Sequence, residues 1–568
     1  MIDIEKQWTT IRLPKTPLVA GLSPILTKIL LARGIKPAQM HEHIEASPTS
    51  IRPSSLLPGV EQAVGQIRQA IEQQALITVV GDYDVDGMTA SVLLHEVLEE
   101  LGVKTEIVIP DRRRDGYGIS SEIIERIYQR SPHSKHLIIT VDNGSNAHEA
   151  IARALELGIE IVVTDHHTVN DGNEAVTMVN PNNPLNPYSF GGLSGVGVIW
   201  KVARELLDSY GFIQKAWDYL DLVALGTIAD VSPLVDENRV LVKLGLQMIN
   251  SNPRPGIREL IKIQLAKRLN AGLEKVSAYD VGMYLAPCLN AAGRIGDVME
   301  AVGLLLCRDL EEAPRIANSL AALNQERKRI TKQGMLAAMD QLASSAVIPK
   351  IICLPLQDLD ESICGLVAGR IKETYNRPTL VFTRSNGEVW KGSGRSISKF
   401  DMTLLMRTLS HIAPGGGHPQ ACGFCLIEEN MDAFLNAVQL FGEEQIEDQQ
   451  FIKVIRVDLA VEPGEVTSGL FKEIEKLQPF GSGWEEPIVG MRGISVSGEA
   501  MGKNSDHLRL RCNRSGLIFK GWGMLRKYQM LGQPSFVDII GKVRRNFWNN
   551  RESFEIEITD LRVNIDNR

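Results

Sequence analysis

Residues 75–165 alternate between short runs of β-branched residues and stretches with the apolar periodicity of helices. Four runs have strand character, at residues 76–80, 105–109, 136–141 and 159–163. Strands separated by helices pair in parallel, and continuously apolar strands are buried on both faces of their sheet. We therefore predict an α/β fold with a mostly parallel sheet, in which ligands bind at the carboxyl ends of the strands.

Acidic residues and histidines follow three of these four strands. They are Asp82, Asp84 and Asp86 after the first strand, Asp142 after the third, and Asp165, His166 and His167 after the fourth. A separate apolar helical stretch also ends at an acidic residue, Asp230. Because the carboxyl ends of parallel strands lie at one edge of a sheet, we expect the strand-end groups to converge there.

Several carboxylates at one edge repel one another, which raises their pKa values and destabilises the fold unless cations neutralise them. Oxygen ligands with one or two imidazoles suit Mn²⁺ or Mg²⁺, and Mn²⁺ is the better match for histidine. Two such ions activate water and stabilise the leaving oxygen in phosphoester cleavage. The pattern predicts a phosphoesterase with two divalent ions. The alternative is a set of acidic helix N-terminal loops beside an incidental histidine pair.

The remainder of the chain divides into segments of different character. We predict an N-terminal arm at residues 1–70, a catalytic domain at 71–250, a helical connector at 251–345, a second and smaller α/β domain at 346–445, and a β-barrel at 451–568. The connector contains one long helix, at about residues 311–341. The last segment alternates apolar and polar residues, which is typical of half-buried antiparallel strands.

The barrel segment differs in charge from the rest of the chain. Residues 501–568 contain 13 Lys and Arg against 7 Asp and Glu, a net charge of +6 within a chain whose total is −8, so the remainder carries −14. Basic residues interleaved with aromatic rings suit single-strand binding, since the charges follow phosphates and the rings stack on bases. The aromatic residues are Phe519, Trp522, Tyr528, Phe547 and Trp548, of which we expect only Trp548 to be exposed.

The start of the chain has no leader-like pattern. Residues 1–15 carry charged groups where a signal peptide has an apolar run, and no stretch approaches about 18 consecutive apolar residues. The seven cysteines are scattered, without the spacing of a disulfide framework. We therefore expect a cytoplasmic protein with no membrane anchor.

Four blocks of the sequence carry a family resemblance. They are Asp82-Tyr-Asp84-Val-Asp86-Gly, Asp142-Asn-Gly, Asp165-His166-His167 and Gly226-Thr-Ile-Ala-Asp230. In this order they resemble the motifs of the DHH phosphoesterase superfamily. Four further blocks are Leu289-Asn290-Ala-Ala-Gly-Arg294, Lys391-Gly-Ser-Gly-Arg395-Ser396, Gly415-Gly-Gly-His418 and Leu477-Gln-Pro-Phe-Gly481. These look like the motifs of the RecJ exonucleases, in which a DHHA1 domain and an OB-like barrel follow the DHH domain. The resemblance extends over about residues 58–560.

The resemblance implies a role for each residue of the acidic cluster. Asp84, with Asp82 nearby, would hold one ion, Asp142 would bridge, and Asp86, His166 and Asp230 would hold the other. His167 would contact the scissile phosphate, while Asp165 would orient the histidines. The catalytic set implied by the family is therefore Asp84, Asp142, Asp165, His166 and His167, with two Mn²⁺ or Mg²⁺ ions as cofactors.

Candidate substrate-binding residues lie in further motifs. Arg294 follows a run of small residues that begins at Asn290, and Arg395 and Ser396 end a glycine-rich block, where glycines let the backbone approach an anion. His418 ends a second glycine-rich block. Arg112 and Tyr117 lie on the loop after the second strand and suit a terminal 5′ phosphate and a stacked base. Trp548 is the candidate of the barrel.

The implied activity is a metal-dependent 5′ to 3′ exonuclease that degrades single-stranded DNA to 5′ mononucleotides in repair and recombination. Two alternatives remain: a phosphodiesterase for short oligoribonucleotides or cyclic dinucleotides, against which the basic barrel argues, and an inactive replication scaffold, against which the intact ligand set argues. A single-strand-binding protein and a helicase are implied partners, and a monomer is expected. Cys288, Asp360 and Trp484 depart from the family's pattern, which indicates a divergent branch.

Overall fold

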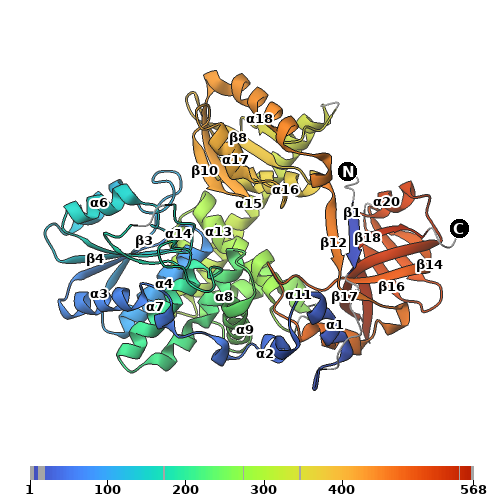
Figure 1. Ribbon diagram of the computed structural model, residues 1–568, viewed down its shortest axis with the longest axis horizontal. Helices are drawn as coiled ribbons and strands as arrows, with labels where there is room; N and C mark the ends of the chain where they lie inside the picture. The colour runs from blue at the N-terminus through green and yellow to red at the C-terminus, as the bar shows by residue number, and fades with distance from the viewer. Residues whose placement is uncertain are drawn as a thin grey trace.

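The computed structural model describes residues 6–10, 19–170, 173–270, 272, 274–344, 347–503, 505–548 and 551–564, with the backbone alone at 386 and 548. Four bodies follow one another along the chain (Figure 1): a parallel-sheet domain, a helical connector, a second α/β domain and a β-barrel. The predicted fold class is confirmed. None of the helices in the described ranges combines the length and apolar character of a membrane span.

The first sheet has the strand order β3-β2-β4-β5-β6, and every neighbouring pair is parallel. Its strands are β2 (Leu76–Val80), β3 (Thr105–Val108), β4 (His136–Val141), β5 (Glu160–Thr164) and β6 (Thr177–Val179). The first four coincide with the predicted runs to within a residue or so. The sequence does not predict β6, because three residues are too few to display a periodicity.

Helices cover both faces of this sheet (Figure 1). On one face lie α5 (Ser121–Arg130) and α6 (His148–Glu156), and on the other α3 (Val60–Glu72), α4 (Val85–Glu100) and α7 (Gly195–Ser209). The apolar side of α3, including Val60 and Ile67, belongs to the core under the sheet. The predicted boundary at residue 70 therefore passes through α3, and the N-terminal arm ends before it.

The connector consists of packed helices that lead to the second domain. They are α8 (Leu220–Ala229), α9 (Asp236–Ser251), α10 (Pro255–Gln264), α11 (Ala266–Asn270), α12 (Ala278–Asp280), η5 (Val281–Leu285), α13 (Ala286–Ile295), α14 (Val298–Leu306) and α15 (Glu312–Ala343). The last is the predicted long helix. Residues 220–227 of α8 are all buried, so its C-terminal end is firmly placed. This end carries Asp230 to the first sheet.

The second domain has a mixed sheet of order β10-β11-β9-β8-β7, in which only β7 and β8 are parallel. Its strands are β7 (Ile352–Pro355), β8 (Thr379–Asn386), β9 (Val389–Arg395), β10 (Gly415–His418) and β11 (Ala421–Ile427), and its helices are α16 (Cys364–Tyr375), α17 (Met402–Thr408) and α18 (Met431–Gln445). Both glycine-rich blocks are strands. A Cβ at Gly392 would overlap the Phe424 ring, so this glycine serves packing rather than approach to an anion.

The C-terminal segment closes into a barrel of five strands. They are β14 (Val489–Met501), β15 (His507–Cys512), β16 (Ile518–Gly521), β17 (Phe536–Trp548) and β18 (Arg551–Val563). Their order around the barrel is β14-β15-β16-β18-β17, and the pairing of β17 with β14 closes it. The short β13 (Leu459–Ala460) extends the sheet beside β14, and α19 (Ser468–Glu475) and α20 (Leu525–Met530) pack on the barrel. Closure removes the exposed edges of the sheet.

The N-terminal arm joins the other bodies. Its strand β1 (Lys6–Thr10) pairs in parallel with β12 (Lys453–Val457), the strand between the second domain and the barrel (Figure 1). Its helix α1 (Pro24–Ala32) is followed by Arg33, which forms a two-pronged ion pair with Asp458. The arm thus fixes this linker against the barrel.

Trp484 lies at the same junction and is only 3 % exposed. Its Nε1 donates to the carbonyl oxygen of Leu477, and the guanidinium carbons of Arg33 and Arg239 lie 4.7 and 5.3 Å from its ring centroid. Arg239 in turn donates to three carbonyl oxygens of residues 477–479. The departure at position 484 is therefore a packing residue between domains and not a DNA contact.

Candidate metal centre and phosphate pocket

Acidic and imidazole side chains from four segments meet at the carboxyl edge of the parallel sheet. Ligand-type atoms within each of three sets lie within 4.8 Å of one another: Asp82, Asp84 and Asp142; Asp86, His166 and Asp230; Asp142, His166 and His167. Asp142 and His166 each belong to two sets, so the sets form one continuous centre. The structure therefore brings together every residue expected to bind metal.

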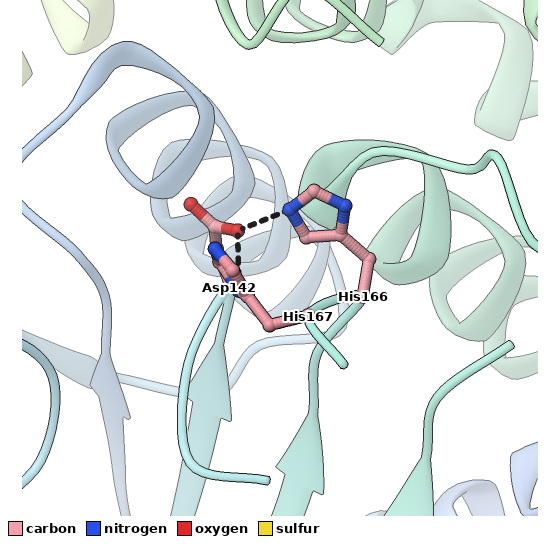
Figure 2. Close-up of side chains that lie close together, drawn as sticks. All are labelled: Asp142, His166 and His167. Atoms are coloured by element: carbon pink, nitrogen blue, oxygen red, sulfur yellow. Dashed lines mark ion pairs between the residues drawn. The ribbon is translucent and has the colours of Figure 1, made fainter. Parts of the chain in front are cut away.

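Asp142 lies in the middle of this centre (Figure 2). Its Oδ1 is 3.1 Å from Nε2 of His166 and 3.9 Å from Nδ1 of His167. Its φ of 64° is in the left-handed region, which aspartate tolerates better than most residues. A Cβ at Gly195 would lie 2.6 Å from Oδ1 of Asp142, so only glycine lets α7 begin so close to the carboxylate.

The start of α7 also holds Asp86. The backbone N–H groups of Gly195 and Val196 donate to its two oxygens at 2.7 and 2.9 Å, and a helix N-terminus favours negative charge. On the other side, a Cβ at Gly226 of α8 would lie 2.8 Å from Oδ1 of Asp86. Small residues on two helices thus allow the carboxylate to sit between them. Asp230 lies just beyond α8.

Asp165 is fully engaged within the protein. Its oxygens accept hydrogen bonds from the backbone N–H groups of Ser145, His166 and His167 and from Nδ1 of His167 at 2.8 Å. Burial opposes its ionisation, yet the hydrogen bonds from His167 hold the pKa of Asp165 below its usual value. With its oxygens occupied, Asp165 is suited to orienting the two histidines.

The remaining carboxylates suit divalent cations. Burial raises the pKa values of Asp82 and Asp142, with repulsion from Asp84 and Asp86 respectively adding to the effect. Burial and the charge of Asp230 raise the pKa of Asp86 to about 7. The Oδ1 atoms of Asp82 and Asp142 are buried and accept no hydrogen bond from the described residues. Unsatisfied carboxylate oxygens beside imidazole nitrogens match the ligand preferences of Mn²⁺ and Mg²⁺.

A pocket of arginines adjoins the centre. The guanidinium carbon of Arg112 lies 5.0 Å from the ring centroid of Tyr83, and Nη1 of Arg294 donates to the carbonyl oxygen of Ser362 at 2.9 Å. Burial, then repulsion from Arg112, Arg327 and Arg395, lowers the pKa of Arg294 to about 9. Across the described ranges, none of Arg112, Arg294 and Arg395 is ion-paired with a carboxylate. Half-buried guanidinium groups that form no ion pair are suited to an anion.

Aromatic groups border the centre on the substrate side. The hydroxyl of Tyr117 lies 3.1 Å from Nε2 of His167. The ring of His418, on β10 of the second domain, stacks on that of His167 with centroids 5.9 Å apart and an interplanar angle of 22°. The second domain therefore contacts His167 of the acidic centre.

Of the substrate-binding candidates, Asn290 and Ser396 remain to be placed. Asn290 lies on α13 one turn before Arg294, half-buried. Ser396 is 3 % exposed, and its hydroxyl donates to the carbonyl oxygen of Phe400, so it is occupied away from the pocket. Ser393 lies beside Arg395 instead: a Cβ at Gly365 would lie 3.1 Å from Oγ of Ser393 and 2.8 Å from Nη2 of Arg395, and this Oγ also lies 3.4 Å from the carbonyl oxygen of Cys422. The alternation of a strand puts 393 and 395 on one face and 396 on the other.

The barrel surface corrects the expectation about its aromatic residues. Phe519 and Tyr528 are buried as expected. Trp522 is 56 % exposed and Phe547 45 % exposed, so the expectation that only Trp548 is exposed is wrong. Trp522 follows the last residue of β16, and Phe547 is the penultimate residue of β17, so both lie at strand ends, where alternation is a weak guide to burial. The side chain of Trp548 lies outside the described residues.

Cys288 is one of the three residues that the sequence sets apart from the family's pattern. Its side chain is fully buried, the amide of Gln264 lies 3.6 Å from its Sγ, and burial raises the pKa of its thiol to about 12. The chain therefore has an inert packing residue at this position, behind the arginine pocket.

The parallel sheet, the acidic edge and the second domain that covers it define a phosphoesterase of the DHH type. Residues 76–227 match the DHH family, N-terminal domain, residues 349–444 the DHHA1 domain, and residues 457–560 the RecJ OB domain. The single-stranded-DNA-specific exonuclease RecJ of Escherichia coli is 34 % identical over 85 % of this chain and 88 % of its own length. The chain belongs to the RecJ family of exonucleases.

Solved structures agree with this assignment. RecJ of Thermus thermophilus in complex with Mn²⁺ matches 99 % of this chain and 80 % of its own, with a TM-score of 0.84 and 27 % identity. RecJ of the same organism in complex with Mg²⁺ matches with a TM-score of 0.77 and 26 % identity over 98 % of this chain and 78 % of that one.

Proposed function

We propose that this chain is a two-metal exonuclease that degrades single-stranded DNA from its 5′ end and releases 5′ mononucleotides. The observation that carries this proposal is the uncompensated arginine pocket beside the acidic centre. A pocket for a terminal phosphate, next to groups that hold catalytic cations, selects a strand end over an internal phosphodiester. Relatives named as single-stranded-DNA-specific exonucleases support the substrate and the activity.

The proposed ligands divide between two ions. Asp82 and Asp84 would hold one and Asp86, His166 and Asp230 the other, with Asp142 shared between them. When bound, the two ions supply a hydroxide nucleophile and neutralise charge on the leaving oxygen. Structures of a relative with Mn²⁺ and with Mg²⁺ support both as cofactors.

His167 contributes a proton donor. Burial opposes its charge, but the hydrogen bond with Asp165 raises the pKa of His167 to about 9, so the imidazole is protonated at neutral pH. With Nδ1 engaged by Asp165, Nε2 is the nitrogen left to donate to a substrate, and the Tyr117 hydroxyl lies 3.2 and 3.1 Å from the two nitrogens. A charged donor there stabilises the negative charge that develops on a phosphate oxygen.

The arginines position the strand. Arg294 and Arg395 are half-buried, and Arg112 lies against Tyr83. Guanidinium groups bind phosphate through paired N–H donors. We assign Arg112, Arg294 and Arg395, with Ser393 in place of Ser396, to the terminal phosphate, and Tyr117, Asn290 and His418 to the adjoining nucleotide.

The barrel supports a long substrate over a dinucleotide, since it adds basic and exposed aromatic groups that a short substrate would not reach. The complete ligand set argues against an inactive scaffold. By the same family assignment we propose a cytoplasmic monomer that acts in repair and recombination with a single-strand-binding protein and a helicase.

Digestion of end-labelled oligonucleotides tests the proposal. DNA and RNA, single- and double-stranded, are incubated with Mn²⁺ or Mg²⁺ and the products are resolved by length. We expect a 5′ label on single-stranded DNA to appear at once as mononucleotide while a 3′ label reports progressive shortening, and Asp142→Ala to abolish both. Internal fragments, or faster hydrolysis of dinucleotides than of long strands, would overturn the proposal.

A further inference from the structure

An ion pair joins the two domains at the mouth of the phosphate pocket. Nη2 of Arg113, on the loop after β3, lies 2.6 Å from Oδ2 of Asp360 in the second domain. The Arg113 side chain is 55 % exposed and that of Asp360 24 %. We propose that Asp360 is a positioning residue for two phosphate-binding arginines. It positions Arg112 of the first domain through Arg113, and it positions Arg294 of the connector through Ser362. This inference rests on the proposed function and names a determinant of its end recognition.

The Arg113 loop is held together by its own hydrogen bonds. Oδ1 of Asp111 accepts hydrogen bonds from the backbone N–H groups of Arg113 and Arg114, and Asp115 is held by Arg114 and Arg126. Fixing Arg113 to the second domain therefore also fixes its neighbour Arg112. The guanidinium of Arg112 then lies against the ring of Tyr83, the residue between Asp82 and Asp84.

Asp360 reaches Arg294 through its other oxygen. Oδ1 of Asp360 accepts from the backbone N–H of Ser362 at 2.9 Å and from its hydroxyl at 2.6 Å, which caps the short helix η6 (Glu361–Ile363). The carbonyl oxygen of Ser362 accepts from Nη1 of Arg294. One oxygen of Asp360 thus pairs with Arg113 of the first domain. The other oxygen holds Ser362, whose carbonyl oxygen accepts from Arg294 of the connector.

The pocket needs such an anchor because its arginines repel one another. Arg112 and Arg395 add to burial in lowering the pKa of Arg294, so like charges crowd this pocket. An acidic residue at the rim, outside the pocket, opposes this without occupying the phosphate position. Asp360 can do so because its two oxygens face different partners, Arg113 on one side and Ser362 on the other.

Two variants separate the two oxygens' roles. Asp360→Asn keeps an acceptor for Ser362 and removes the charge that Arg113 pairs with, whereas Asp360→Ala removes both. KM and kcat are measured with single strands that carry a 5′ phosphate or a 5′ hydroxyl. For the phosphorylated strand we expect KM to rise about threefold in Asp360→Asn and about tenfold in Asp360→Ala, with kcat changed less than about twofold. The preference for the 5′ phosphate should fall in parallel.

Asp401 provides a matched control. Its Oδ1 caps α17 in the same domain by accepting from the backbone N–H of Thr403 at 2.8 Å and its hydroxyl at 2.6 Å, with no ion pair to another domain in the described ranges. Asp401→Ala should lower the melting temperature about as much as Asp360→Ala and leave KM unchanged. Arg113→Gln, made from the opposite side, should reproduce Asp360→Asn, and the double variant should be no worse than either.

The outcomes distinguish failure of the positioning role of Asp360 from failure of the proposed exonuclease function. Wild-type hydrolysis together with an unchanged KM in Asp360→Asn and Arg113→Gln overturns the inference alone. Equal KM values for Asp360→Ala and Asp401→Ala also overturn it, because a merely structural cap would then explain both. Absence of hydrolysis by the wild-type protein overturns the proposed function, and the inference with it.

Discussion

Nε2 of His166 lies 3.1 Å from Oδ1 of Asp142, although the two residues follow different strands. The register of the sheet explains this proximity, because Val141 of β4 is paired with Thr164 of β5, so the residues that come next leave the sheet side by side. A parallel sheet thereby converts separate sequence motifs into one centre. Predictions about that centre follow from the hydrogen bonds and charges around it.

Substitution of His167 should separate chemistry from metal binding. Because Asp165 holds Nδ1 and the imidazole is charged at neutral pH, His167→Gln removes a donor to the phosphate, and kcat should fall about 10²- to 10³-fold. Mn²⁺ affinity, measured by calorimetry, should change less than about threefold. His411→Gln, at an exposed position, is the control and should match the wild type. Loss of metal binding in step with kcat would assign His167 to the metal instead.

Stability without divalent ions should depend on pH. Burial raises the pKa of the Asp86 carboxyl from 3.8 to about 7, so its contribution to folding is complete below pH 3.8 and is lost as pH rises through about 7. In EDTA we expect the melting temperature to fall by several degrees between pH 5.5 and 8. Mn²⁺ should restore it, and by more at pH 8, since it binds the ionised carboxylates. A melting temperature that rises over this range in EDTA would contradict the account.

Trp484 should matter for stability and not for chemistry. Its ring is buried between Arg33 and Arg239, so Trp484→Ala should cost about 3–5 kcal/mol of local stability and lower the melting temperature of the transition that includes the barrel. Hydrolysis per folded molecule at low temperature should change less than about twofold. Differential scanning calorimetry and a rate measurement check both statements. An unchanged thermogram with impaired DNA binding would show a substrate contact instead.

Trp522 should behave in the opposite way. Because more than half of its side chain is exposed, Trp522→Ala should leave the melting temperature nearly unchanged. Loss of one base-stacking ring is expected to weaken binding of a long single strand about tenfold. Fluorescence anisotropy with the Asp142→Ala background prevents digestion during the measurement. Equal affinity of the two proteins would exclude this ring from the binding surface.

Much of the centre can be predicted from the sequence because it lies at strand ends. The runs that form β2, β4 and β5 are continuously apolar, so their ends, and with them Asp82, Asp142 and Asp165, can be located and placed at one edge. The strand pattern therefore predicts that these three carboxylates lie near one another, although the sequence shows none of the contacts between them.

The phosphate pocket is less predictable, because its residues depend on contacts between domains. The glycines of β9 hide its strand character, so the alternation that puts Ser393 rather than Ser396 beside Arg395 is not evident. The link from Asp360 to Arg113 joins residues 247 positions apart and has no local signal. Burial of Trp484 depends likewise on the N-terminal arm, since Arg33 contributes one side of its pocket.

The acidic centre should hold two divalent ions, with Asp142 between them. Anomalous diffraction at the manganese edge, from crystals of the wild-type protein soaked in Mn²⁺, tests it most directly. We expect two peaks, one against Asp82 and Asp84 and the other against Asp86, His166 and Asp230, both in contact with Asp142. A single peak, or ions bound away from Asp142, would contradict it.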